Sequence, residues 1–189
     1  WGGIYFYNDT RAITAWGDTR PDYGRPEVRQ YIRDNVLQWL EEFRLSGVRW
    51  DSVLSTRTTN WGDNGDGWSL LQWINNEVNT RQPWKLMVAE DLQGNPWVTK
   101  TTGAGGAGFD AQWTPDFVHP LRPLMTTSSD SGRNMNDLVG ALTGNYNGNP
   151  FERVIYTESH DEVANGRSRV PQEIDPGNPG SYWARKRST

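Results

Sequence analysis

The sequence has 189 residues, a net charge of −4, no cysteine and two histidines. The absence of cysteine excludes a disulfide framework and a thiolate metal site, and the acidic balance lacks the footprint of a nucleic-acid-binding protein. With only His119 and His160 available as imidazole ligands, we expect no metal site. Hydrophobic residues make up only 34%, but 11 tryptophans argue for a folded chain, because disordered chains are poor in aromatic residues. We expect most of these tryptophans in the core and the others as platforms for planar-faced ligands such as sugars.

Alternating helices and short strands are predicted along the first half of the chain. Apolar residues recur at spacings of three and four over Pro26 to Arg44, which predicts a helix. The run GVRWDSV at 47–53 predicts a strand, and a Gly/Asn/Asp loop follows at 60–67. A second helix is expected around Ser69 to Asn79, and KLMVAED at 85–91 predicts another strand. No apolar run approaches the length of a membrane span.

The second half continues the alternation. The Gly-rich stretch at 101–113 contains no GK[ST] and precedes its strand, so we do not interpret it as a phosphate loop. We found no internal repeat. The elements expected here are a strand at Gly108–Gln112, helices at Phe117–Met125 and Asn134–Leu142, and a strand at 153–159 followed by a long Gly/Pro/Asn segment. Alternating strands and helices indicate a parallel sheet, either a doubly wound open sheet or a (β/α)8 barrel. The dinucleotide-binding open sheet has little support because no GxGxxG follows a strand.

Acidic residues stand where three of the predicted strands stop. The first strand ends on Asp51, with Arg49 two residues earlier and therefore on the same side. The second ends on Glu90 and Asp91, and the third on the cluster 160–162. Any one of these acids could simply cap a helix or face solvent. Three together at the carboxyl edge of a parallel sheet, where active sites are built, favour a catalytic interpretation.

Carboxyl groups that converge repel one another and shift their pKa values apart, which is useful where one must be ionised and another protonated. Cleavage of a glycosidic bond with retention needs such a pair, one carboxylate as nucleophile and one carboxyl as acid and then base. Two-metal phosphoryl chemistry also uses acid clusters. It usually requires more acids and positive partners for phosphate, so glycoside chemistry is favoured.

Three motifs in order resemble the short signature regions of the α-amylase family, glycoside hydrolase family 13. They are GVRWDSV, MVAEDL and TESHDEV. The stretches SHDEV, GFDAQW and PDYGRPEVR are most similar to the 1,4-α-glucan branching enzymes of that family. The resemblance extends over essentially the whole chain. It implies an α/β fold in which residues 1–189 form an incomplete catalytic (β/α)8 TIM barrel, roughly from the third loop to just past strand seven.

The resemblance also implies a role for each matching residue. Asp51 would be the nucleophile, Glu90 the general acid/base, and Asp161 the residue that stabilises the distorted sugar. Arg49 would orient Asp51, and His160 would bond the sugar in the same subsite. The implied reaction is transglycosylation without a cofactor, in which α-1,4 bonds of a glycogen- or starch-like glucan are exchanged for α-1,6 branches. The expected partner is this polysaccharide, with no nucleic acid and no membrane, in the cytoplasm.

Other residues near these motifs have weaker assignments. Gln112 and Trp113 could line an acceptor groove for the substrate, although ordinary packing explains them equally well. Trp50 points away from Arg49 and Asp51 on an alternating strand, so we expect it in the core. Structural or solvated roles are expected for His119, Glu158 and Glu162.

One departure from the family matters. Its first signature region, with an Asp and a His at the end of strand three, is not visible here. The chain starts at Trp1 without Met and stops at ARKRST, so we expect a fragment that is inactive or poorly folded alone, because a barrel lacking strands cannot close. A hydrolase or debranching enzyme of the same family, and a non-catalytic glucan-binding relative, stay open as alternatives. The oligomeric state is left open.

Overall fold

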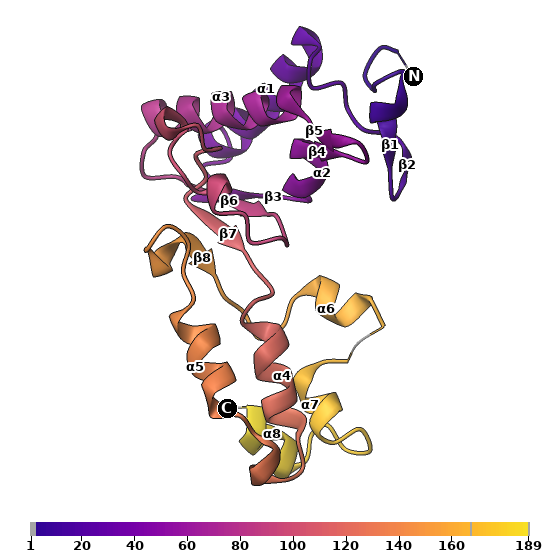
Figure 1. The fold of residues 1–189 in the computed structure, drawn as a ribbon, viewed down its shortest axis with the longest axis vertical. Coiled ribbons are helices and arrows are strands. Elements are labelled where there is room, and N and C mark those ends of the chain that lie inside the picture. The colour runs from indigo at the N-terminus through magenta and orange to yellow at the C-terminus, as the bar shows by residue number, and fades with distance from the viewer. Residues whose placement is uncertain (1–2, 167, 189) are drawn as a thin grey trace. The chain divides into compact units, whose positions relative to one another are not determined.

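The structure is a computed structural model that describes residues 3–166 and 168–188, so that Trp1, Gly2, Arg167 and Thr189 lie outside the described residues (Figure 1). These residues form two compact units. The first comprises residues 3–113 and 146–152, and the second comprises 114–145, 153–166 and 168–188. Each unit is described by itself below.

A parallel sheet organises the first unit, as predicted. Strand β3 (Gly47–Trp50) pairs with β6 (Leu86–Glu90), and β6 pairs with β7 (Ala111–Trp113), both in parallel. The predicted first and second strands are therefore confirmed in position. The third begins at Ala111 rather than Gly108 and ends at Trp113. The fold is thus mixed α/β with strands joined by crossover connections.

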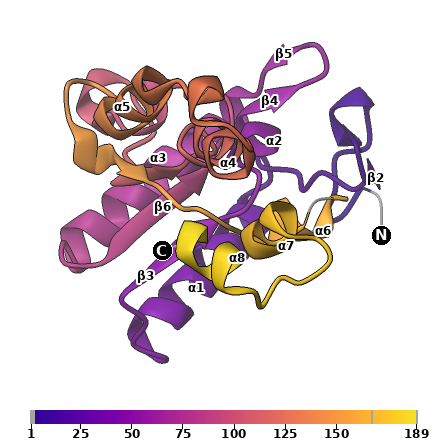
Figure 2. The same ribbon diagram turned by 90° about the horizontal axis from the view of Figure 1, so that it is seen from below.

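Two long helices lie on one face of this sheet (Figures 1 and 2). Helix α1 (Pro26–Glu41) has its proline in the first turn, where the missing N–H has no helical acceptor to lose. It ends three residues before the predicted Arg44, which takes a left-handed φ of 56°. Helix α3 (Gly65–Arg81) starts before the predicted Ser69, since Asn64 caps it by accepting the Gly67 N–H at 3.5 Å. The short helix α2 (Val53–Arg57) follows β3.

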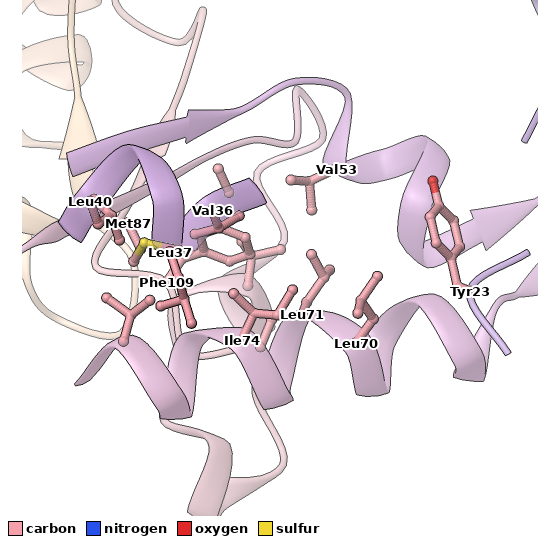
Figure 3. Packing of buried hydrophobic residues seen from close by; sticks show 14 of the residues in the cluster. Tyr23, Val36, Leu37, Leu40, Val53, Leu70, Leu71, Ile74, Met87 and Phe109 are labelled. Atoms are coloured by element: carbon pink, nitrogen blue, oxygen red, sulfur yellow. The ribbon is translucent and has the colours of Figure 1, made fainter. Parts of the chain in front are cut away.

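The core of the first unit lies between the helices and the sheet (Figure 3). Fully buried side chains come from both long helices and the central strand: Leu40, Leu70, Leu71, Ile74, Val78, Met87 and Ala89. Burying each leucine or isoleucine is worth about 1.5–3 kcal/mol. Trp50 packs against this cluster, with its ring edge-to-face on Phe109 at a centroid distance of 6.1 Å. The prediction that Trp50 is a core residue is confirmed.

Two small antiparallel hairpins share one construction. They are β1 (Ile13–Thr14) with β2 (Gly17–Asp18), and β4 (Thr58–Thr59) with β5 (Gly62–Asp63). Both carry the sequence Thr-x-Trp-Gly-Asp, a short repeat that the sequence analysis did not detect. In each, the threonine hydroxyl donates to the glycine carbonyl and accepts the tryptophan N–H. The glycines have φ values of 117° and 132°, which a side chain would strain.

Helices predominate in the second unit. Helix α4 (Val118–Thr126) and helix α5 (Met135–Thr143) confirm the two predicted helices to within a residue at each end. The strand predicted at 153–159 is wrong beyond its start, because β8 covers only Arg153–Val154. Two short helices, α6 (His160–Ala164) and α7 (Val170–Ile174), lie within the Gly/Pro/Asn segment predicted after it. A third, α8 (Tyr182–Ser188), begins at about the residue where that segment was expected to end.

Short 3-10 helices complete the described elements: Thr10–Ala12, Pro96–Val98, Thr102–Ala104, Asp130–Gly132 and Pro150–Glu152. None of the helices described by the structure is long and apolar enough to span a membrane.

Candidate active site

The carboxyl edge of the sheet in the first unit gathers three of the predicted site residues. Trp50 is paired with Ala89 across β3 and β6, so Asp51 comes level with Glu90, and Glu90 is paired with Trp113 across β6 and β7. Paired residues in a parallel sheet point to the same side. Asp51, Glu90 and Trp113 therefore emerge on the face opposite to the helices.

Arg49 joins the two acids. Its Nη1 lies 2.8 Å from Oδ1 of Asp51, and its Nη2 lies 2.8 Å from Oε1 of Glu90. A guanidinium presents its N–H groups in a rigid fork, so it can hold both carboxyls at once. The guanidinium carbon also lies 5.4 Å from the ring centroid of Trp113, within the range of a cation–π contact. The sequence therefore predicted correctly that Arg49 and Asp51 share a side, and the structure adds Glu90 to the pair.

The two acids differ sharply in environment. The side chain of Asp51 is 78% exposed, whereas that of Glu90 is 9% exposed. Burial raises the pKa of Glu90 above its ordinary value, and the neighbouring Asp51 raises it further. The Ser52 N–H and the charge of Arg49 oppose this rise in pKa. A buried carboxyl beside an exposed one is the arrangement that moves the pKa values of two carboxyl groups apart.

The backbone just after β3 completes the surroundings of Glu90. Ser52 donates its N–H to Oε2 of Glu90 at 2.8 Å. Ser52 itself takes the left-handed conformation, with φ 44° and ψ 53°, which is uncommon for a residue with a side chain and is seen at functional sites. Both carboxylate oxygens of Glu90 are thus held, one by Arg49 and one by this N–H.

Asp91, the next residue, has a structural role. It is fully buried and pairs with Arg57 of α2 through Nε–Oδ1 at 2.7 Å and Nη2–Oδ2 at 3.1 Å. The same Nη2 donates to Oε1 of Gln93 at 3.0 Å. This two-pronged pair ties the loop after β6 to the helix after β3, and so fixes the chain on both sides of Glu90.

Gln112 lies on the helix side of the sheet, because it pairs with Ala89 and alternates with Trp113. Its side chain is 1% exposed and donates from Nε2 to the Asn95 carbonyl at 2.9 Å. Gln112 therefore supports the loop after β6 in this structure, and contact with substrate stays a prediction. Trp113 stands beside Glu90 and Arg49, where a role in the acceptor groove stays a prediction as well.

His160 and Asp161 belong to the second unit. They form the first turn of α6 rather than the end of a strand, because Ser159 caps this helix by accepting the Glu162 N–H at 3.2 Å. Nε2 of His160 lies 3.2 Å from Oδ2 of Asp161, and both side chains are largely exposed. Their assignment to a sugar subsite stays a prediction.

The remaining polar residues of this unit make local contacts. Nε2 of His119 lies 3.0 Å from Oε1 of Glu162. Glu158 accepts the Val170 N–H at 2.6 Å and the Arg169 Nε–H at 3.1 Å, which ties the start of α7 to the segment before α6. These contacts agree with the structural roles expected for all three. Among the described residues, no group of three or more His, Cys, Asp or Glu is arranged to hold a metal ion.

Sequence reasoning missed two contributors to this edge. The first is the Ser52 N–H, a backbone donor. Ser52 has a left-handed φ, which its residue type does not predict. Arg57 stands in a helix too short to show apolar periodicity, so its partner Asp91 looked like a further candidate acid. The buried pairing of Arg57 with Asp91 depends on the fold, because the two residues are 34 apart in the sequence.

A protein class emerges from the comparison with curated proteins, although no protein-family model matches the chain. The similar proteins are 1,4-α-glucan branching enzymes, and the similarity runs over most of this chain.

Among these are the GlgB branching enzymes of Oceanobacillus iheyensis, 29% identical over 95% of this chain and 30% of the relative, and of Kitasatospora aureofaciens, 28% identical over 97% and 25%. That of Frankia casuarinae is 31% identical over 89% of this chain and 22% of the relative. The chain thus spans less than a third of the length of these relatives.

Proposed function

We propose that the protein carrying this chain is an α-1,4-glucan branching transglycosylase of the α-amylase family, glycoside hydrolase family 13. The observation that carries the proposal is the Arg49 bridge between an exposed Asp51 and a buried Glu90 whose pKa is raised. The similarity to curated branching enzymes supports the choice of glucan as substrate. A cytoplasmic location is part of the proposal.

In the proposed reaction, Asp51 attacks the anomeric carbon and forms a covalent glycosyl-enzyme. The Asp51 side chain is 78% exposed and contacts Arg49 at 2.8 Å, so its carboxylate is accessible to the anomeric carbon. Glu90 donates its proton to the leaving glycosidic oxygen, for which its raised pKa suits it at neutral pH. The same group then removes the proton from the 6-hydroxyl of an acceptor chain, which attacks the intermediate and restores the acid.

Asp161 and His160 would act on the sugar itself. On the basis of the resemblance, we propose that Asp161 contacts the ring hydroxyls of the distorted sugar and that His160 acts in the same subsite. Hydrogen bonds to ring hydroxyls that strengthen in the transition state contribute several kcal/mol in glycosidases. The two side chains are 70% and 48% exposed, so a ligand can reach both.

For the fold, we propose a partial (β/α)8 barrel in a single catalytic domain. The three parallel strands, the helices on one face and the acids at the carboxyl edge support it. A cleft of about 600 Å³ beside β3 also supports it, because Tyr5, Tyr31 and Trp39 line it where a further strand and helix would pack. On this proposal the isolated 189 residues are inactive.

The test uses the complete protein that carries these residues, incubated with amylose. Branching is expected to shift the iodine absorbance and to produce α-1,6 signals in the proton NMR spectrum, with little new reducing sugar. Reducing ends that rise in step with the loss of iodine colour would show a hydrolase instead. Binding of amylose without either change would show a non-catalytic glucan-binding protein.

A nucleophile variant sharpens the assignment. Asp51→Asn should lower kcat by about 10³-fold or more, since a neutral amide cannot form the glycosyl-enzyme. Asp34→Asn, a change on the outer face of α1 to a side chain that is 56% exposed, is the matched control and should leave kcat unchanged. An Asp51→Asn protein with parental kcat would refute the assignment.

A further inference from the structure

A second cavity of the first unit, with a volume of about 360 Å³, is lined by neither Asp51 nor Glu90. Its walls come from the end of α2, the β4–β5 hairpin, the first turn of α3 and the loop after β6. The lining side chains are Arg57, Asp63, Asn64, Trp68, Asn95 and Trp97. Two indoles thus stand among two amides, a carboxylate and a guanidinium.

The walls of this cavity are held in place by the surrounding chain. The indole N–H of Trp68 donates to the Gly105 carbonyl at 3.1 Å. The side chain of Asn95 accepts the Trp97 N–H at 3.0 Å, and the Asn95 carbonyl accepts the amide of Gln112 at 2.9 Å. A ligand would therefore meet a site that is already formed, which lowers the entropic cost of binding.

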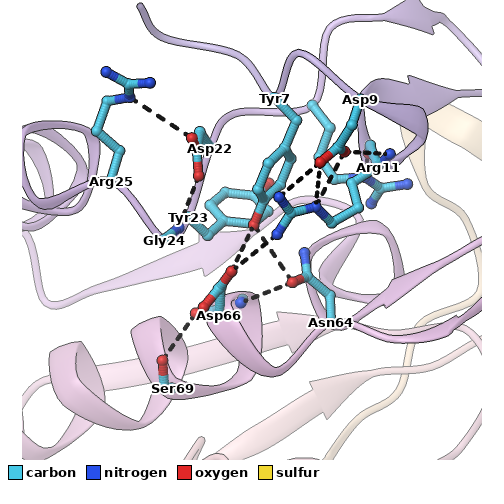
Figure 4. A network of polar contacts seen from close by, with 12 residues as sticks. Tyr7, Asp9, Arg11, Asp22, Tyr23, Gly24, Arg25, Asn64, Asp66 and Ser69 are labelled. Atoms are coloured by element: carbon cyan, nitrogen blue, oxygen red, sulfur yellow. Dashed lines mark hydrogen bonds and ion pairs between the residues drawn. The ribbon is translucent and has the colours of Figure 1, made fainter. Parts of the chain in front are cut away.

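One buried donor of a cavity-lining residue has no acceptor among the described residues. Asn64 is 4% exposed, and its Oδ1 accepts hydrogen bonds from the Tyr7 hydroxyl at 3.4 Å and the Gly67 N–H at 3.5 Å (Figure 4). Its Nδ2 is buried and has no partner among the described residues. Arg57 also lines the cavity, with its Nε and Nη2 bonded to Asp91 and Gln93. A buried donor without a partner, such as Asn64 Nδ2, is uncommon in folded proteins.

We propose that this cavity is a subsite for a glucose residue of an α-glucan chain, outside the catalytic acids. The inference rests on the proposed function. A sugar combines apolar ring faces, which stack on indoles, with hydroxyls that both donate and accept. Its hydroxyls can accept from Arg57 and donate to Asp63, both of which line the cavity. An apolar ligand would leave these polar groups unpaired, and an anion would meet the carboxylate of Asp63. Ligand pockets have volumes of about 300–1,000 Å³. The volume of this cavity lies at the small end of that range, as expected for a short piece of glucan chain.

Arg57 connects the subsite to the active site. The same guanidinium that lines the cavity holds Asp91, the residue next to Glu90. A sugar bound to this guanidinium would therefore be anchored on the element that positions the proposed general acid. Arg57 is a positioning residue on this view, and Trp97 is the main contact with the sugar. Lys100 lies over one face of the Trp97 ring, with Nζ 3.9 Å from its centroid, and Trp97 is 45% exposed, so part of the residue is accessible to a ligand.

The experiment measures the Kd for maltoheptaose by calorimetry in the complete protein carrying Asp51→Asn, so that no turnover occurs. Trp97→Ala should weaken binding about tenfold, as truncation of a tryptophan hot spot does, and Trp97→Phe should restore most of the affinity. Asp63→Ala should weaken binding about threefold. Asp63 stands at an exposed position of the β4–β5 hairpin, so the change should leave folding intact. Trp84→Ala is the matched control, because Trp84 is 72% exposed on the α3–β6 connection and lies outside the cavity lining.

Each outcome bears on the inference separately from the proposed function. Parental Kd values for Trp97→Ala and Asp63→Ala would overturn the subsite, even in a protein that branches amylose. Equal losses in Trp97→Ala and Trp84→Ala would also overturn it, because the effect would then be general. Binding that depends on Trp97 and Asp63 in a protein with no branching activity would support the subsite and refute only the proposed function.

Discussion

Replacing Arg57 with methionine should destabilise the protein by about 3–5 kcal/mol, the cost of leaving a buried charge without its partner. The side chain of Asp91 is fully buried and that of Arg57 is 8% exposed, so water cannot replace the lost guanidinium. The pair is joined by two hydrogen bonds, at 2.7 and 3.1 Å. Methionine keeps most of the length and apolar surface of arginine, so the loss is chiefly electrostatic.

Urea unfolding at pH 7, followed by tryptophan fluorescence, measures this loss. Arg81→Met is the matched control. Arg81 also contacts a carboxylate, Glu41 at 2.6 Å, but the two side chains are 41% and 38% exposed, and such surface pairs contribute only about 0–1 kcal/mol.

A loss below about 1 kcal/mol for Arg57→Met, equal to that of Arg81→Met, would refute the reasoning. It would mean that Asp91 is hydrated in the folded protein. The double variant Arg57→Met with Asp91→Leu provides a second check. Replacing a whole buried pair with apolar residues is often neutral, so the double variant should recover most of the stability that the single variant loses.

Two further predictions concern Glu90. Arg49→Met removes a positive charge that opposes the rise in its pKa, so the alkaline limb of kcat/KM against pH should move to higher pH. An unmoved limb would contradict the role of Glu90 as the acid. Because the folded-state pKa is raised, the stability contributed by Glu90 is present below its unfolded value of about 4.3 and is lost as pH rises through the folded value. Glu90→Gln should therefore raise the urea midpoint at pH 8 relative to the parent and leave it little changed near pH 4, and an equal gain at both would contradict this.

Periodicity and alternation predicted much of the first unit. The spacing of apolar residues predicted α1 and α3 because both helices bury a continuous stripe against the sheet. Alternation placed Arg49 and Asp51 on one side and Trp50 on the other, and the core contacts of Trp50 confirm its placement. These features depend on local geometry, which a single sequence carries.

The second unit shows where the same reasoning fails. The run Arg153 to Tyr156 has the composition of a strand, but pairing depends on a non-local partner, and only two residues pair. The start of α6 had a local signal that was overlooked. Ser159 and Glu162 form the S-x-x-E pattern that opens helices, and the Glu162 N–H does bond the Ser159 hydroxyl. Ser159 therefore stands at the start of a helix rather than at the end of the predicted strand.

Exposure is what separates the acids at the strand ends. Asp51, Glu90 and Asp91 look alike in the sequence, yet their surroundings differ. Asp51 faces water, Glu90 contacts Arg49 and the Ser52 N–H, and Asp91 is buried in its ion pair with Arg57. Their mutual repulsion is tolerated because each finds a different source of compensation. The roles proposed for Asp51 as nucleophile and Glu90 as acid agree with this difference, since the exposed carboxylate is accessible to a substrate and burial raises the pKa of the other. The difference in burial is determined only by the folded chain.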